Sequence, residues 1–419
     1  MLFFGAVYAL YYALPVLSVE RYARLFYSTA DYTFHADSGL IPDEILEHAL
    51  LVALAGLCVL FLAYYWIARP LERLLPRLNM KWTNVRKLRL TCMLFGIFGL
   101  SAYYIRLVAP ISLQMTQFVL LLSDVCFVAV TALFMLQLKR KLPPSWVLFL
   151  WGGLIIPRVL LGFGTGGVAH GVDIVLLLLV TLTTIRQKVP VAALLLGTVL
   201  LFISLPVKQE VRNRTWIGSD AKKSPVEKSG IYLDVLADFL SGKGIPFSDG
   251  MQIGIQRIGQ ILTLADVVAL TPSVVPYWMG ETYYPLLWKP IPRFLYPDKP
   301  MEQSGQDFGH RYKFLSTTDG DTSYNLPQLV EFYANFGSIG VIIGMFLLGL
   351  IYRSIDYMCF HNDSGMGALV AGLYILSKLL LIESALSLVL GGVVWGAVLL
   401  TLFHLVVKAT SAHSGGAAL

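Results

Sequence analysis

The chain alternates between long apolar runs and short charged loops up to residue 207, and one long polar stretch then separates this part from three further runs. A helix needs about 20 apolar residues to cross the hydrocarbon core of a bilayer. Ten runs approach or reach this length, namely 1–18, 45–68, 88–108, 111–138, 145–163, 168–185, 189–207, 328–352, 366–384 and 386–407. The pattern predicts an all-α polytopic membrane protein with about ten transmembrane helices.

The polar stretch divides the chain into three parts. We expect an N-terminal transmembrane bundle of about seven helices in 1–207, a catalytic loop in 208–327, and about three transmembrane helices in 328–419. Inside the loop, Ile253–Leu270 has one apolar and one polar face, which predicts an amphipathic helix that lies on the membrane surface or caps the bundle. Seven prolines follow between residues 272 and 300, and they favour an irregular, stiff path.

Basic residues concentrate in alternate short loops, which predicts the orientation of the chain. The loop between the second and third runs carries seven basic residues and one acid, and Lys139–Lys141, Arg186–Lys188 and Arg353 follow other runs. The positive-inside rule places these loops and both termini in the cytoplasm and the 208–327 loop outside. The N-terminal run lacks a basic leader and a clear cleavage site, so we expect a retained span.

Composition excludes several classes of protein. Hydrophobic residues make up 56% and charged residues 14% of the 419 residues, whereas soluble domains are about one quarter charged. The net charge of +6 does not indicate nucleic-acid binding, because the basic residues are not gathered on one polar face. The four cysteines lie in or beside apolar runs, which argues against a disulfide framework and against a cysteine metal site.

No phosphate loop, serine-hydrolase elbow or dinucleotide fingerprint is present, and we expect no cofactor. Asp319 and Asp321 lie in a sequence typical of a solvated turn, so no metal site is predicted.

Cations at the start of the loop are candidate phosphate ligands. Lys208 and Arg212 are four residues apart and share one helix face, with Arg214 close by. A guanidinium offers a planar fork of donors to phosphate oxygens. Spacing alone favours the alternative, in which these side chains extend to lipid headgroups. Arg257 in the amphipathic segment is a further candidate, although an ordinary charged helix face is the more usual role.

Cations also crowd the proline-rich part of the loop. Lys289, Arg293 and Lys299 stand beside Trp288 and Tyr296. Cations and aromatic rings on a stiff backbone suit sugar and diphosphate binding, and they equally suit a structural strut; the sequence leaves both interpretations open.

Two residues are candidate proton acceptors. His310 is the only histidine of the loop and has the side-chain pKa range of a general base, although a hydrogen-bonding loop histidine is more usual. Glu331 lies near the start of the eighth run, where an ionisable group suggests a functional site. The alternative is a carboxylate stabilised by the dipole at a helix start. Arg158 and Glu383 are further ionisable residues in or at the ends of runs, and they fit either a buried pair or the active cavity.

Three motifs together resemble the Wzy-like polysaccharide polymerases, from Pro272 to Arg353. They are Tyr277-Trp278-Met279-Gly280, Pro292-Arg293-Phe294-Leu295-Tyr296-Pro297-Asp298-Lys299-Pro300 and Glu331-Phe332-Tyr333-Ala334-Asn335-Phe336-Gly337 with Gly340, accompanied by Lys208, Arg212 and Trp216. Some members also carry paired Arg-x10-Gly motifs in two outer loops. Here the spacing occurs only from Arg186 to Gly197, on the predicted cytoplasmic side.

The resemblance implies a bacterial inner-membrane glycosyltransferase that polymerises undecaprenyl-diphosphate-linked oligosaccharide repeat units, with inversion, at the outer face. It also implies a fold related to O-antigen ligases and to peptidoglycan polymerases. Membrane lipid and a chain-length regulator protein are the further expected partners, and nucleic acid is not one.

The resemblance also suggests roles for the candidate residues. The diphosphate would bind Lys208, Arg212, Arg214, Arg257, Arg293 and Lys299; the catalytic residues would be Glu331, His310 and Arg293; and the sugar contacts would be Tyr277, Trp278 and Tyr324. Three alternatives stay open, namely a ligase-type glycan transferase, a transporter or flippase of lipid-linked glycan, and a non-catalytic scaffold.

Overall fold

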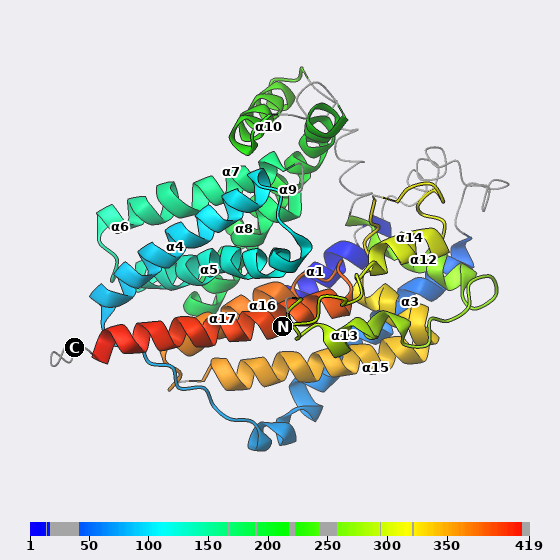
Figure 1. Ribbon diagram of the computed structural model, residues 1–419. Helices are drawn as coiled ribbons and strands as arrows, with labels where there is room; N and C mark the ends of the chain where they lie inside the picture. Colours follow the sequence, from blue (N-terminus) through cyan, green and yellow to red (C-terminus); the bar gives the residue numbers. More distant parts are fainter. Residues whose placement is uncertain are drawn as a thin grey trace.

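The computed structural model describes residues 1–13, 15–16, 42–165, 168–188, 191–217, 223–243, 258–293, 295–320, 322–361 and 363–412, and the regular secondary structure in these ranges is all helical (Figure 1). The predicted all-α class is therefore confirmed. Within these ranges six helical segments are long and apolar enough to cross a membrane, namely Asp43–Ile67, Val85–Val108, Gln114–Leu138, Pro144–Gly164, Gln328–Cys359 and Leu386–Ala409. This arrangement is that of a multi-pass membrane protein.

The helices carry the labels of Figure 1. The long ones are α3 (Asp43–Leu62), α4 (Val85–Val108), α5 (Leu113–Leu138), α6 to α7 (Pro144–Leu148 and Ile156–Gly164, joined by the wider turns of Phe149–Ile155), α8 (Val168–Arg186), α9 (Val191–Arg212), α15 (Gln328–Cys359) and α17 (Leu386–Ala412). The shorter ones are α1 (Leu2–Tyr12), α10 (Pro225–Leu240), α12 (Gln260–Leu270), α13 (Pro285–Trp288), α14 (Ser304–Arg311) and α16 (Met366–Leu379).

Two of the predicted spans form short helices. The run 1–18 contributes α1, with 11 residues, and the run 366–384 contributes α16, with 14 residues. At 1.5 Å per residue α16 is about 21 Å long, which is shorter than the roughly 30 Å hydrocarbon core. Both helices are thus shorter than the roughly 20 residues that a bilayer span needs.

Side-chain caps and small residues explain much of the bundle. The Asn84 side chain accepts the Lys87 N–H and starts α4, and Ser224 and Glu227 form a capping box at the start of α10. Helices α4 and α5 approach closely at Gly99, where an added Cβ would lie 2.5 Å from the Cys126 nitrogen. Close backbone approach at small residues is typical of helix pairs in membranes.

Helix α15 is broken near its start. Phe336 and Gly337 have non-helical backbone angles, which divide it into a short arm (328–335) and a long arm (338–359). A Cβ on Gly344 would collide with the Phe332 ring, although a straight helix would separate these two positions by about 18 Å. The short arm therefore folds back against the long arm, and Leu329 and Val341 both reach Gly56 of α3.

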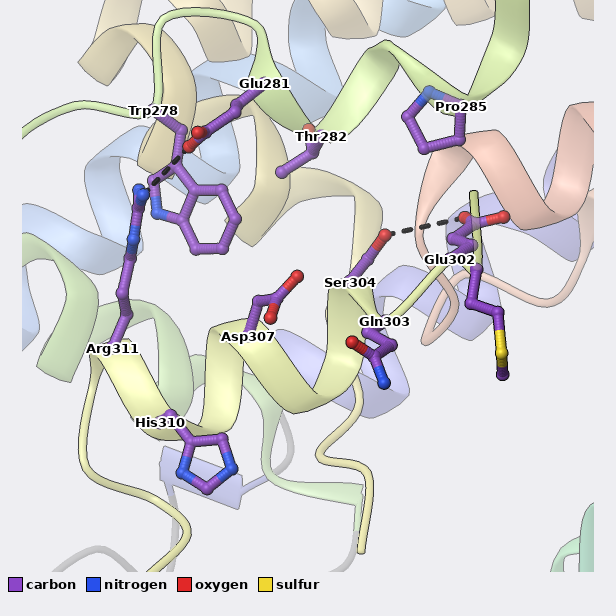
Figure 2. Close-up of a pocket in the computed structure, with 11 residues that line it drawn as sticks. Trp278, Glu281, Thr282, Pro285, Glu302, Gln303, Ser304, Asp307, His310 and Arg311 are labelled. Carbon is purple, nitrogen blue, oxygen red and sulfur yellow. Dashed lines mark hydrogen bonds and ion pairs between the residues drawn. The ribbon is translucent and has the colours of Figure 1, made fainter. Parts of the chain in front are cut away.

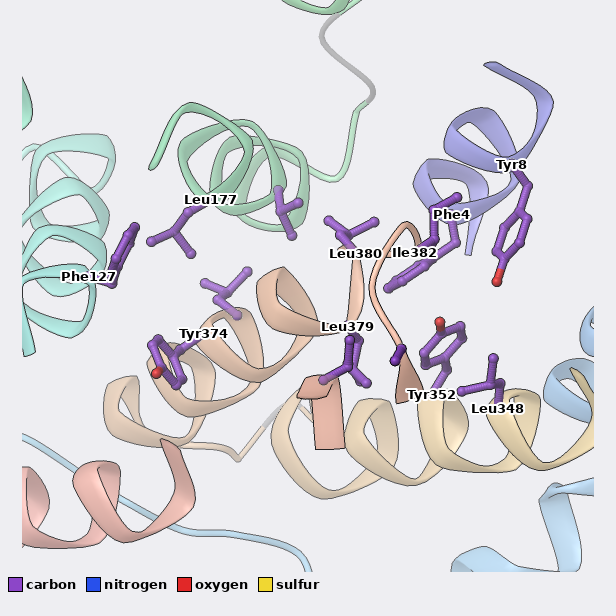
Figure 3. Close-up of a cluster of buried hydrophobic side chains, with 14 of the residues drawn as sticks. Phe4, Tyr8, Phe127, Leu177, Leu348, Tyr352, Tyr374, Leu379, Leu380 and Ile382 are labelled. Carbon is purple, nitrogen blue, oxygen red and sulfur yellow. The ribbon is translucent and has the colours of Figure 1, made fainter. Parts of the chain in front are cut away.

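The turn between α16 and α17 also lies inside the bundle. Its residues Leu380 and Ile382 are 5% and 2% exposed, and Figure 3 shows them beside Phe4 and Tyr352. The Gln328 N–H donates to the Ile382 carbonyl over 3.0 Å, which joins this turn to the short arm. Two non-helical backbone segments thus meet inside the protein. Membrane proteins tolerate such irregular backbone only where other parts of the protein enclose it.

Helix α12 corrects one expectation. The amphipathic pattern of Ile253–Leu270 predicted a surface or capping helix, but in α12 even the polar Gln260 and Asp266 are buried. The surface position is wrong, because α12 packs against α1, α3 and α15. Residues 253–257 of this segment lie outside the described ranges.

Two of the basic segments lie together, namely the loop after α3 and the end of α15. Arg353 near the end of α15 pairs with Glu72, and the Leu78 N–H donates to the Met358 carbonyl over 2.9 Å. Figure 1 shows α6 and the C-terminal end of α17 at the left, whereas α12, α13 and α14 lie to the right. These two basic segments therefore lie away from α12, α13 and α14 of the predicted catalytic loop.

Candidate functional site

A cleft of about 570 Å³ opens between two segments of the predicted loop. Figure 2 shows its lining, which consists of Trp278, Glu281, Thr282, Pro285, Met301, Glu302, Gln303, Ser304, Asp307, His310 and Arg311. The first four come from the start of α13 and the segment before it, and the others come from α14 and the residues that lead into it. The cleft combines carboxylates, a guanidinium and an indole.

Arg311 and Trp278 form one wall of the cleft. The Arg311 guanidinium carbon lies 4.1 Å from the centre of an indole ring of Trp278, and its Nη2 is 2.9 Å from a carboxylate oxygen of Glu281. The side chains of Arg311 and Glu281 are 40% and 51% exposed, so the pair is open to a ligand. A cation over an aromatic face gives a flat, polar-rimmed surface.

Helix α14 presents two ionisable groups without partners. The side chains of Asp307 and His310 make no hydrogen bond or ion pair with any described residue. Figure 2 shows Asp307 pointing into the space between Trp278, Thr282 and Ser304, whereas His310 lies farther out, at the edge. Asp307 is therefore better placed than His310 to take a proton from a ligand in the cleft.

Asn335 of the short arm holds the floor of the cleft. This fully buried side chain accepts the Gly280 N–H over 2.8 Å and donates to the Thr282 hydroxyl over 2.9 Å and to the Glu331 carbonyl over 2.8 Å. The Trp278 backbone N–H donates to the Ala334 carbonyl over 3.1 Å. The first and third motifs of the family resemblance are thus hydrogen-bonded to each other.

The break in α15 is also part of this contact. Gly337 has a φ of +63°, and a Cβ there would lie 2.8 Å from the Tyr277 hydroxyl. The half-buried Tyr277 packs on the bend, so its predicted role as a sugar contact competes with a structural one. Glycine suits this bend because its backbone accepts positive φ without steric cost.

Arg293 and Lys299 bind their own loop. The Arg293 guanidinium donates to the carbonyls of Lys299 over 2.5 Å and of Pro297 and Pro300 over 3.4 Å. The Lys299 ammonium donates to the Ile291 carbonyl over 2.8 Å and to the Lys289 carbonyl over 3.3 Å. Burial, together with the charges of Lys289 and Arg293, lowers the Lys299 pKa. The proline-rich motif therefore folds as a compact loop, in which two cations bind backbone carbonyls of the loop itself.

Lys289 connects this compact loop to the cleft and to α17. Its ammonium pairs with Glu302 of the cleft lining, and Glu302 also accepts a hydrogen bond from the Ser387 hydroxyl. The Lys289 carbonyl accepts the Trp395 indole N–H over 3.3 Å. The second motif is thus linked to the cleft indirectly, through the hydrogen bond from its Lys299 to the Lys289 carbonyl.

Glu331 lies beneath the cleft and is fully buried. Its Oε2 accepts the Leu386 N–H over 2.6 Å, and its Oε1 has no hydrogen-bond partner among the described residues. The side chain does not line the cleft. Asn335 links the two through its hydrogen bonds to Thr282 and to the Glu331 carbonyl.

The other predicted cations lie elsewhere. Lys208, Arg212 and Arg214 belong to α9 and the turn that follows it, which pack against α8 and α10, and the cleft lining contains none of them. Arg214 pairs with Glu210 over 2.7 Å. Arg257 lies outside the described residues, as does Asp321. The expected meeting of these arginines with Arg293 is therefore not seen in the part of the chain that the structure describes.

The remaining candidates have structural contacts. Tyr324 stacks on Phe314 with ring centres 4.5 Å apart, inside an aromatic cluster that includes Phe308. Glu383 accepts a 2.6 Å hydrogen bond from Asn325. Arg158 pairs with Asp173 over 3.0 Å. Across the described ranges, no group of three or more His, Cys, Asp or Glu side chains is arranged to hold a metal ion.

Sequence reasoning missed Asp307, Arg311 and Glu281. Asp307 and Arg311 are four residues apart, a spacing that places two side chains on one helix face, and this signal was available. The contact of Arg311 with Trp278 was not, because 32 residues separate them in the chain.

A family model with the description "Domain of unknown function (DUF8712)" matches residues 74–412, a range that includes the whole cleft. The chain belongs to this family. No curated protein and no solved structure gives a significant match to it.

Proposed function

We propose that this protein is a membrane glycosyltransferase that polymerises oligosaccharide repeat units carried on a polyprenyl diphosphate. Its active site is the cleft between Trp278 and α14. One observation carries the proposal: the three motifs that resemble the Wzy-like polymerases, distant in sequence, come together beside this cleft. The first motif supplies Trp278 to the lining and is joined to the third by the hydrogen bond from the Gly280 N–H to Asn335. The second motif is joined indirectly, because its Lys299 donates to the carbonyl of Lys289, whose side chain pairs with Glu302 of the lining.

The lining suits a sugar acceptor. Its carboxylates, Glu281, Glu302 and Asp307, accept hydrogen bonds from sugar hydroxyls. Trp278 is only 7% exposed, and its ring holds the Arg311 guanidinium at the cleft. Asp307, which has no partner among the described residues, is the proposed base, and His310 is the second candidate. A base must lie within hydrogen-bond reach of the proton that it removes.

The chemical step is a single displacement. Asp307 takes the proton of the acceptor hydroxyl, and the acceptor oxygen forms a bond to the anomeric carbon of the donor. The bond from that carbon to the diphosphate oxygen breaks, and the diphosphate leaves with the electron pair. Inversion at the anomeric carbon follows from attack on the face opposite the leaving group.

The leaving diphosphate needs positive charge beside it. Arg311 offers an exposed guanidinium at the cleft, which would exchange Glu281 for a phosphate oxygen. Arg293 and Lys299 stiffen the neighbouring loop and add their charge to this region. In this proposal Lys208, Arg212 and Arg214 would contact a different part of the lipid-linked substrate, farther from the cleft.

The topology is part of the same proposal. About ten spans, cytoplasmic termini and an outward-facing cleft in a bacterial inner membrane agree with the two basic segments that lie away from α13 and α14. A polyprenyl tail would then enter the cleft from the outer leaflet.

The test is polymerisation by the purified protein in lipid nanodiscs, with a lipid-linked repeat unit as the sole substrate. Wild-type protein should give a ladder of products. Asp307→Asn and Arg311→Ala should each lower the rate by about 100-fold or more, the usual contribution of a general base or of a charge-stabilising donor.

Asp234→Asn on α10 and Arg73→Ala in the basic loop are matched controls, because both residues are exposed and distant from the cleft. They should leave the ladder unchanged. A wild-type protein that makes no ladder but transfers the glycan to another acceptor would be a ligase. Full activity of both cleft variants would remove the cleft from the mechanism.

A further inference from the structure

Two polar side chains of the short arm meet the turn between α16 and α17 inside the bundle. Gln328 and Glu331 are three residues apart on one helix face, and both are fully buried. The Gln328 backbone N–H donates to the Ile382 carbonyl over 3.0 Å, and the Glu331 carboxylate accepts the Leu386 N–H over 2.6 Å. Both residues therefore face the same turn.

The side chains of Gln328 and Glu331 each keep one oxygen without a hydrogen bond. The Gln328 amide nitrogen lies 3.5 Å from the Leu381 carbonyl, and one Glu331 oxygen is engaged by Leu386. The remaining oxygens, Gln328 Oε1 and Glu331 Oε1, are buried and have no partner among the described residues. Both are acceptors, so neither satisfies the other as long as Glu331 is ionised.

The charge around Glu331 is also unbalanced. No Lys, Arg or His among the described residues forms an ion pair with it. The Thr282 hydroxyl faces the carboxylate, and the ionisable groups that act on it are Glu302, whose charge is paired with Lys289, and Tyr283. An isolated buried carboxylate is costly, and such groups become neutral unless a counter-charge is present.

One hydrogen atom resolves both deficits. We propose that Glu331 is a neutral carboxylic acid whose Oε1–H donates to Gln328 Oε1, so that this pair locks the short arm of α15 to the start of α17. Glu331 is then a positioning residue and not the base. It holds the helix whose Asn335 supports the cleft floor through Gly280 and Thr282.

The expected effects on the polymerisation rate rest on the proposed function. The expected spectra and melting temperatures do not depend on it. Glu331→Gln is the conservative variant, because its amide can donate to Gln328 Oε1 while its oxygen accepts the Leu386 N–H. Glu331→Leu removes both bonds. Gln328→Leu removes the acceptor and leaves the acid in place.

Infrared difference spectra of the full protein in nanodiscs, wild type minus Glu331→Gln, should show the C=O stretch of a protonated carboxyl group. That band should shift to higher frequency in Gln328→Leu. Glu331→Gln should keep the wild-type melting temperature and polymerise within about threefold of wild type, whereas Glu331→Leu should melt lower and lose at least tenfold in rate.

A Glu331→Gln protein that folds normally but polymerises 100-fold more slowly would make Glu331 the base and overturn the inference. Absence of the carboxyl band would also overturn it, as would thermal stability that depends on sodium, since either would indicate an ionised group. If no variant or wild-type protein polymerises, the proposed function fails, and the spectra and melting curves still decide the protonation state.

Discussion

Asn335 shows how much of the site depends on single buried side chains. It is fully buried and makes two hydrogen bonds that join the short arm to the segment before α13, to the Gly280 N–H and the Thr282 hydroxyl, and a third within the short arm to the Glu331 carbonyl. The sequence identified Asn335 as part of a motif. It did not indicate that the amide holds a backbone N–H 55 residues earlier.

Asn335→Ala should destabilise the protein by about 1–3 kcal/mol, because the buried Gly280 N–H loses its acceptor. Thermal unfolding in detergent, followed by near-ultraviolet circular dichroism of the aromatic residues, would measure the change. Asn213→Ala removes an exposed amide and serves as the control. Equal melting temperatures for the two variants would contradict the role given to Asn335.

Gly337→Ala tests the bend in α15 at the same scale. Positive φ costs a side-chain-bearing residue about 1–2 kcal/mol, and the new methyl group would also press on the Tyr277 hydroxyl. Gly392→Ala in α17 is the matched control, since its Cβ would meet open space. In a helix this change is expected to stabilise by up to about 1 kcal/mol. Melting curves of the two variants should therefore move in opposite directions.

At the scale of helices, charged residues inside the bundle join neighbouring elements. Arg158 of α7 pairs with Asp173 of α8 over 3.0 Å, and its guanidinium carbon lies 3.7 Å from the centre of the Tyr103 ring of α4. The sequence left open whether Arg158 belongs to a buried pair or to the active cavity, and the structure shows the pair.

Asp173→Asn should destabilise the bundle by about 3–5 kcal/mol, because it removes the carboxylate that pairs with the buried Arg158 guanidinium over 3.0 Å. The double variant Arg158→Met with Asp173→Leu should recover much of this loss, since an apolar pair of similar size leaves no buried charge. The measurement is the melting temperature of the single variants and of the double variant in one detergent. Additive losses in the double variant would contradict a coupled pair.

The broken helix α15 marks the limit of pattern reasoning about elements. The apolar run from residue 328 to 352 predicted one span with Glu331 near its interface. The apolar run continues through Gly337, so the spacing of its apolar residues does not indicate the break. The bend depends on Tyr277, Trp278 and the turn at Ile382, which are distant in sequence.

At the scale of the whole molecule, two basic segments and the cleft lie apart. The loop after α3 and the end of α15, joined by the Arg353–Glu72 pair, lie away from the cleft. If the proposed orientation holds, an impermeant maleimide added to intact cells should label Thr317→Cys and should leave Arg73→Cys unlabelled.

Both positions are exposed, so permeabilised cells should give labelling at each of them. The native Cys92, Cys126 and Cys359 are buried and should contribute little background, and replacing the exposed Cys58 by Ser removes the remaining signal. Labelling of Arg73→Cys alone in intact cells would reverse the proposed topology.

The sequence by itself determined the membrane class, the helical fold and the positions of the long helices, because length and apolar composition are local properties that any bilayer span must satisfy. Residues 168–186 and 191–212 form helices as predicted. It also identified the motifs at Trp278 and Glu331 as the segments to examine.

Only the tertiary structure decided which polar groups meet. Helix α12 is buried because other helices surround it, the short arm turns back because distant residues hold its bend, and Asp307 and Arg311 form a cleft with Trp278 through chain reversals that no local pattern records. Contacts between distant segments depend on the path of the whole chain, whereas periodicity reports only on neighbours a few residues apart.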